Sequence, residues 1–335
     1  DWYVDQMKRK AYTSEAIPSQ ISHDKYRWGS RDVLYFQNVD PLFNREVSQR
    51  RWDVKDFIDW IDSDKPQTKF KFFLEQQDVD VNEYPENTQN LVYYPTQKIR
   101  IPVNKKNALE SGLVKEKDSA LMVDYIDIDL PGAITKKSMM MLDIVANNDW
   151  KRPLYFSGGS FDDAEFIWMK EYLQLDGLAY KLVPIKTEMS YSFDMGRIDS
   201  DFMYDIVTKW DWGNSGSPDI YHDPQTRIQG ITYRSNLARL MHQLIEENKI
   251  DKAKDIINLA MDNMPVAHFG YYHFVVPFID GYYKVGETNK AHDLFNTMKQ
   301  LYQERLAYYY GLPLDQQYDK IDDIITDMES YRRVI

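Results

Sequence analysis

The sequence contains no cysteine among its 335 residues. Disulfides, zinc sites built on thiolates and a cysteine nucleophile are therefore excluded together. This absence fits an oxidising extracytoplasmic space, where a free thiol is a liability, and it fits the cytoplasm as well. Long apolar runs are missing too, so the sequence predicts no membrane-spanning helix and no signal peptide. The chain begins at Asp1 rather than at a methionine, which predicts that it is part of a longer protein.

Positive charge is scarce, because 41 basic residues face 53 acidic ones and the net charge is −12. A protein that binds duplex nucleic acid needs a basic face to neutralise phosphates. The basic clusters here, such as Lys8-Arg9-Lys10 and Arg50-Arg51, are short and far apart in the sequence. We therefore expect solvated surface at these positions and no nucleic-acid partner.

Aromatic residues are abundant, with 25 Tyr, 15 Phe and 8 Trp. Tyrosine joins an apolar ring to a hydroxyl and suits half-wet surfaces that bind sugars, peptides or partner domains. A tyrosine-rich core between layers is the alternative interpretation. With 43% hydrophobic and 28% charged residues, the composition is that of a globular protein, and the length suits two domains.

The front of the chain alternates short strand patterns with helical ones. Strands are expected at 33–36, 99–103, 125–130, 153–156 and 179–185, and helices at 1–17, 54–61, 135–147 and 162–173. Asp53 is the expected N-cap of the second helix. This order predicts an α/β domain over residues 1–200, with a mixed or parallel sheet and crossover helices. Residues 201–232 are expected to be a linker region, with an exposed loop from Trp210 to Pro218.

The back of the chain, residues 233–335, carries apolar residues at helical spacing. Helices are expected at 237–245, 253–264, 274–282 and 291–302, with a last helix at 315–332 that closes the stack. Asp251-Lys252-Ala253 and Asn289-Lys290-Ala291 resemble each other at an offset of 38 residues. Ala253 and Ala291 would let paired helices approach closely. We expect an all-α domain of tetratricopeptide-like repeats.

Candidate sites for chemistry are weak. Asp127 and Asp129 form an Asp-x-Asp triplet, a form in which sugar-nucleotide transferases hold a metal, although on a strand the two residues simply share one face. Ser157, Gly158 and Gly159 lie in a strand-to-helix turn where an anion could dock on free amides. The acidic residues that follow this turn favour a self-capped helix instead. We expect no catalytic residue, no metal site and no cofactor in this chain.

Three stretches of the sequence carry a family resemblance. They are residues 1–9 (DWYVDQMKR), residues 150–157 (WKRPLYFS) and residues 172–184 (YLQLDGLAYKLVP). In this order they resemble the region that follows the membrane part of the DUF2723 proteins of Bacteroidetes. The resemblance implies the C-terminal portion of a multi-pass GT-C-type glycosyltransferase, similar to protein O-mannosyltransferases and using a lipid-linked sugar donor. The catalytic acidic residue of that architecture lies in the membrane part, so no catalytic residue is carried over.

The resemblance leads to an expected function. The chain would be the soluble periplasmic domain of a membrane glycosyltransferase at the inner membrane, anchored by an N-terminal transmembrane half. It would bind or orient an acceptor protein or glycan without being catalytic itself, while the full-length protein would be the enzyme. The first alternative is a protein-interaction scaffold with tetratricopeptide-like repeats and no role in sugar transfer. The second is a free-standing enzyme that uses Asp127 and Asp129.

Overall fold

The computed structural model describes residues 15–22, 33–34, 37–38, 51–94, 96, 98–130, 134–157, 169–188 and 195–335. Most of each helix predicted over 1–17 and over 162–173 lies outside these residues, and the described residues 15–17 are not helical. The chain forms two compact units. The first comprises residues 1–174 and 180–197, and the second comprises residues 175–179 and 198–335. No helix of the described residues is both long enough and apolar enough to cross a membrane.

The first unit contains a small three-stranded mixed sheet, in the order β3 (Trp52–Asp53), β5 (Lys98–Pro102), β6 (Tyr125–Asp129). β3 runs parallel to β5, whereas β5 and β6 are antiparallel and pair Ile99 with Ile128 and Ile101 with Ile126. These four isoleucines are buried, and the alternate residues of β6 are exposed. The period of two in the sequence therefore gives the sheet one apolar face and one solvated face.

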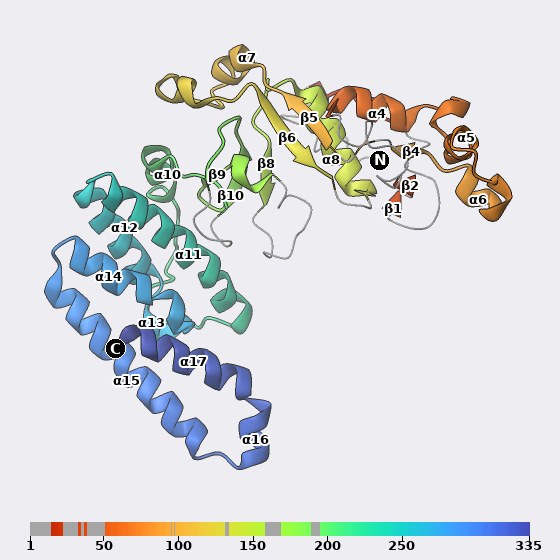
Figure 1. The fold of residues 1–335 in the computed structure, drawn as a ribbon. Helices are drawn as coiled ribbons and strands as arrows, with labels where there is room; N and C mark the ends of the chain where they lie inside the picture. Colours follow the sequence, from red (N-terminus) through yellow and green to blue (C-terminus); the bar gives the residue numbers. More distant parts are fainter. Residues whose placement is uncertain are drawn as a thin grey trace. The chain divides into compact units, whose positions relative to one another are not determined.

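Helices pack beside this sheet and complete the apolar core of the first unit (Figure 1). α4 (Val54–Asp62) begins at Asp53, whose carboxylate accepts the Lys55 N–H at 2.8 Å, so the predicted N-cap is confirmed. α4 buries Val54, Phe57, Ile58 and Ile61 and contacts β5 and α8 (Lys136–Asn148). The shorter helices of the unit are α5 (Phe70–Gln76), α6 (Glu86–Gln89) and α7 (Lys105–Glu110).

The expected mixed sheet is present only as the small β3–β5–β6 sheet, because the described strands are divided among several small sheets. The others pair β1 (Val33–Leu34) with β7 (Ile134–Thr135), β2 (Gln37–Asn38) with β4 (Tyr93–Tyr94), and β8 (Tyr155–Ser157) with the hairpin of β9 (Leu173–Asp176) and β10 (Ala179–Leu182). Strands of two to five residues offer too few ladder positions for a wide sheet. Leu173, expected to end a helix, instead begins β9.

The second unit is helical, which confirms a strand-containing front and a mainly helical back. Its helices are α10 (Ser200–Val207), α11 (Pro224–Glu246), α12 (Ile250–Asn263), α13 (Val266–Phe269), α14 (Val276–Lys284), α15 (Thr288–Tyr310), α16 (Leu314–Asp319) and α17 (Ile321–Val334). The first four predicted helices fall in α11, α12, α14 and α15, and the last, predicted over 315–332, is divided into α16 and α17. Helices also occupy both ends of the stretch 201–232 that was expected to be a linker.

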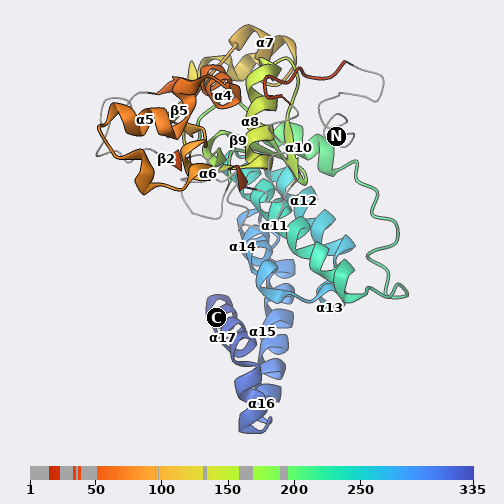
Figure 2. The same ribbon diagram turned by 90° about the vertical axis from the view of Figure 1, so that its right-hand side faces the viewer.

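Small residues set the spacing between these helices. α11 packs against α12 and α14, and α14 packs against α15. A Cβ on Gly281 of α14 would lie 2.3 Å from the Met241 sulfur of α11, so glycine permits this approach. Ala253 and Ala291, each the fourth residue of its helix, are fully buried. The connection between α10 and α11 is an extended segment that runs along α11 (Figure 2).

Candidate functional site

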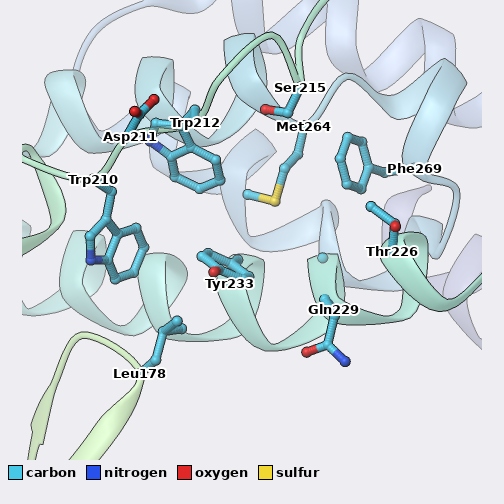
Figure 3. A pocket seen from close by; sticks show the side chains of 11 residues that line it. Leu178, Trp210, Asp211, Trp212, Ser215, Thr226, Gln229, Tyr233, Met264 and Phe269 are labelled. Atoms are coloured by element: carbon cyan, nitrogen blue, oxygen red, sulfur yellow. The ribbon is translucent and has the colours of Figure 1, made fainter. Parts of the chain in front are cut away.

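A pocket of about 420 Å³ lies within the second unit (Figure 3). This volume is within the range typical of small-molecule sites. Its walls come from α11, from the connection between α10 and α11, from the end of α12 with α13, and from the tip of the β9–β10 hairpin. The lining residues are Leu178, Trp210, Asp211, Trp212, Ser215, Thr226, Gln229, Gly230, Tyr233, Met264 and Phe269.

Three aromatic rings form one continuous wall of the pocket. The ring centroids of Trp210 and Trp212 are 5.7 Å apart, and Tyr233 lies 5.2 Å from the first and 5.3 Å from the second. Interplanar angles of 67° and 77° place Trp210 edge to face with the other two rings, the arrangement that aromatic quadrupoles favour, whereas Trp212 and Tyr233 are tilted by 55°. Met264 and Phe269 continue this apolar surface beside Tyr233 (Figure 3).

α11 holds the surrounding segments through two buried polar side chains. The Arg234 guanidinium donates to the Gly270 carbonyl at 2.6 Å and to the Met264 carbonyl at 2.8 Å, which fixes the segment that carries Phe269. Burial lowers the pKa of Arg234 to about 10. The Asn236 amide donates to the Gly177 carbonyl at 2.8 Å and so anchors the hairpin tip. These bonds place the pocket walls on a rigid helix.

Gly177 lets the hairpin tip approach the aromatic wall. Its φ of +73° is a left-handed value that glycine adopts without a Cβ penalty. A Cβ at this position would lie 3.1 Å from the Trp210 ring, closer than ordinary packing allows. The turn therefore seats Leu178 at the edge of the pocket.

The connection between α10 and α11 is fixed on the opposite side of the pocket. The Ser215 hydroxyl donates to the Asn263 carbonyl at 2.8 Å, and His222 Nε2 lies 2.8 Å from the Ser215 carbonyl oxygen. The His222 ring also packs on Phe269, with centroids 4.5 Å apart. The buried His222 is therefore a structural residue that ties the connection to the pocket floor.

Polar groups lie around the rim of the aromatic wall. Asp211 and Gln229 are exposed, and Asp211 accepts the Gly213 N–H at 2.9 Å. Trp212 Nε1 is buried and has no hydrogen-bond partner among the described residues. The lining residues include one carboxylate and no lysine, arginine or histidine. This set of residues can stack an apolar face and bind neutral polar groups.

Asp127 and Asp129, the predicted acidic pair, lie on the solvated face of β6 in the first unit. Asp127 binds Arg100 at 2.7 Å and Arg51 at 3.3 Å, and Arg51 also reaches Asp129 at 3.1 Å. The hydrogen bond from Arg100 lowers the pKa of Asp127. Arg100 lies in addition over the Tyr125 ring, at 4.4 Å. Both carboxylates are therefore engaged by guanidinium groups in a cross-strand network.

The turn predicted to hold an anion is only partly within the described residues. Ser157 is the last residue of β8 and is exposed, while Gly158 and Gly159 lie outside the described residues. Among the described residues, no group of three or more His, Cys, Asp or Glu side chains is arranged to hold a metal ion.

A family model described as TMEM260-associated domain 2 matches residues 1–202, which is more than half of the chain. The chain belongs to the TMEM260-associated domain 2 family. Neither a curated protein nor a solved structure matches it. The TMEM260-associated domain thus covers the described strands of the first unit and ends within α10. Every pocket residue except Leu178 follows it in the sequence.

The pocket that follows the TMEM260-associated domain was not predicted from the sequence. The stretch from Trp210 to Pro218 has turn-forming residues and was interpreted as an exposed loop. A usable signal is present, since two tryptophans separated by one residue are unusual in a loop that faces only water. Tyr233 and Phe269 carry no such signal, because an aromatic residue on a helix is most often part of the core.

Proposed function

We propose that this chain is a non-catalytic binding module of a membrane-associated glycosyltransferase, and that its pocket receives the acceptor protein or glycan. The observation that carries the proposal is the aromatic wall of Trp210, Trp212 and Tyr233 with a polar rim. A concave apolar site with a few polar groups is the usual form of a ligand site. The chemistry of the catalytic step would be supplied by an N-terminal transmembrane half.

Three further observations support this proposal. The family is described by its association with TMEM260, which suits a membrane-protein context. The resemblance to the DUF2723 proteins suggests the glycosyltransferase and an extracytoplasmic location. The buried Ala253 and Ala291 at equivalent helix positions support tetratricopeptide-like repeats, α11–α12 and α14–α15. Repeats of this kind are often used to bind extended peptides.

The proposal is tested on the full chain by NMR titration with serine- and threonine-containing peptides and with neutral, acidic and amino-sugar oligosaccharides. We expect the indole N–H signals of Trp210 and Trp212 to shift with at least one of these ligands. Trp212→Ala should abolish the shift of Trp210, while Tyr221→Ala should preserve it. Tyr221 is a suitable control because it lies in the same connection, is 84% exposed and does not line the pocket. If no peptide or oligosaccharide shifts either signal, the proposal is wrong.

A second candidate function is a protein-interaction scaffold, and an exposed apolar stripe on α16 and α17 favours it. Within each of these two helices the stripe residues are three or four positions apart, as on the face of a helix that packs against another helix. They are Leu314, Tyr318, Ile321, Ile325 and Met328. Most charges beside the stripe are acidic, namely Asp315, Asp319, Asp322, Asp323 and Glu329. The partner proposed for this function is an amphipathic helix of another protein with lysine and arginine flanks.

The two functions are separated by one substitution in each surface. Ile325→Glu changes a half-exposed side chain, so the helix should still fold. In the scaffold function, Ile325→Glu abolishes binding of a basic amphipathic helical peptide in a fluorescence-anisotropy titration, whereas Trp212→Ala has no effect. Binding that survives Ile325→Glu, or loss of binding only at high salt, would count against an apolar docking stripe.

A further inference from the structure

The pocket offers enough chemistry to name a ligand class, and this step rests on the proposed function. We infer that the pocket selects a neutral pyranose unit of a glycan. Sugar rings present an apolar C–H face that stacks on aromatic rings and hydroxyl groups that both donate and accept hydrogen bonds. In the pocket, the aromatic rings of Trp210, Trp212 and Tyr233 can stack on the C–H face. The side chains of Asp211 and Gln229 can form hydrogen bonds with the hydroxyl groups.

Anionic ligands are disfavoured by the charges of the pocket. Its lining contains the carboxylate of Asp211 and no basic side chain. Arg234, a buried cation on the same helix as Gln229 and Tyr233, donates its two terminal nitrogens to the carbonyls of Gly270 and Met264. A phosphate, a sialic acid or a uronic acid would meet a like charge and no cationic partner among the lining residues.

Quaternary ammonium ligands are disfavoured by the spacing of the rings. A cation held by aromatic groups sits over ring faces, within about 6 Å of each centroid. The three centroids here are only 5.2–5.7 Å apart, and the rings pack against one another in edge-to-face and tilted pairs. No space is left between them for a methylated ammonium group. The rings instead present an outer wall against which a flat ligand can stack.

A proline-rich peptide would fill the apolar wall but would not match the rim. Proline has no N–H, so its residues would give the Asp211 carboxylate no donor beyond the Gly213 N–H that it already accepts. Sugar hydroxyls donate to a carboxylate and accept from an amide such as Gln229. Trp212 Nε1, which has no partner among the described residues, is a further donor beside the wall.

The test uses the full chain and four probes: methyl glycosides and disaccharides of neutral hexoses, glucuronic acid, choline and a proline-rich decapeptide. We expect neutral sugars alone to shift the indole signals of Trp210 and Trp212 in ¹H–¹⁵N spectra. Asp211→Asn keeps the side-chain shape and should weaken neutral-sugar binding about tenfold, the effect of losing one charge-assisted hydrogen bond. Tyr221→Ala should leave the dissociation constant unchanged.

The outcomes separate this inference from the proposed function. Shifts with the decapeptide, with choline or with glucuronic acid, and none with neutral sugars, would overturn the sugar assignment and leave a ligand-binding module. No shift with any of the four probes or with the acceptor peptides would overturn both. Neutral-sugar binding that is unaffected by both Asp211→Asn and Trp212→Ala would place the sugar outside this pocket and would likewise overturn the inference.

Discussion

Gly216 lies in the connection that carries four pocket residues, and alanine at this position should detach that connection from α12. A Cβ on Gly216 would lie 2.1 Å from the Asp262 carbonyl oxygen, a distance that real Cβ contacts do not show. Asp262 belongs to the last turn of α12, so the obstacle is helical backbone rather than a flexible side chain. The connection must therefore move away by about 1 Å.

The size of the effect follows from the contacts that this movement breaks. Overpacking costs about 1–3 kcal/mol. The hydrogen bonds from Ser215 to Asn263 and from His222 to Ser215, both 2.8 Å, contribute about 1 kcal/mol each. We expect Gly216→Ala to lower the free energy of unfolding of the second unit by about 3 kcal/mol, because the individual costs are partly relieved by relaxation. This corresponds to a fall in midpoint temperature of about 10 °C.

Gly213→Ala is the matched control, because it changes a glycine of the same connection that has no neighbour to meet. Gly213 has φ +53° and no atom within 4 Å of a Cβ, so only backbone strain of about 1 kcal/mol applies. Stability is measured by thermal unfolding followed by circular dichroism, and the indole N–H signals of Trp210 and Trp212 in ¹H–¹⁵N spectra give the local readout. If Gly216→Ala is as stable as Gly213→Ala and keeps the native tryptophan signal, the packing argument is refuted.

Three other substitutions test separate parts of the structure. Gly281→Val should destabilise the second unit by about 2 kcal/mol in urea unfolding, since its Cβ would lie 2.3 Å from the Met241 sulfur. Gly281→Ala should destabilise it less. Equal stability of the parent protein and both variants would contradict the close approach of α14 to α11. Asp127→Asn should cost at most about 1 kcal/mol at pH 7, because the pair with Arg100 is more than one-third exposed. Since Arg100 lowers the pKa of Asp127, this stabilisation is lost as the pH falls through the folded-state pKa, so the variant should differ less from the parent at pH 3 than at pH 7. Burial raises the pKa of Tyr282 to about 12, so Tyr282→Phe should remove one late-ionising phenol from the absorbance titration at high pH. The stabilisation from this group is present below the unfolded-state pKa of about 10 and is lost as the pH rises toward 12. A titration unchanged above pH 11 would contradict it.

The elements predicted correctly are those whose signal is local. α4 shows this, because Asp53 caps it and Val54, Phe57, Ile58 and Ile61 recur at helical spacing within nine residues. The long helices of the second unit follow from the same periodicity. β5 and β6 also alternate within five residues each, so their solvated and apolar faces could be assigned before their pairing was known.

The features that were missed depend on contacts between distant residues. Leu173 and Leu175 are buried residues of the short strand β9, but the residues before them predict a helix that continues through Leu173. The pocket needs Trp210 to meet Tyr233 and Leu178, which lie 23 and 32 positions away in the sequence. No local sequence pattern predicts contacts between residues so far apart in the chain. For the same reason the sequence shows Asp127 only as a weak candidate site residue and does not reveal its ion pair with Arg100 on the neighbouring strand.

The tip of the β9–β10 hairpin has a consequence for dissecting this protein. Residues 175–179 belong to the second unit, although the strands that lead into and out of them belong to the first. A fragment that starts at Ile198 therefore lacks Leu178 and the Gly177 carbonyl that Asn236 binds. Cutting the chain at one point cannot yield both units intact. The helical unit would have to be supplied with the hairpin tip from outside, in the way that split proteins are complemented by a missing peptide.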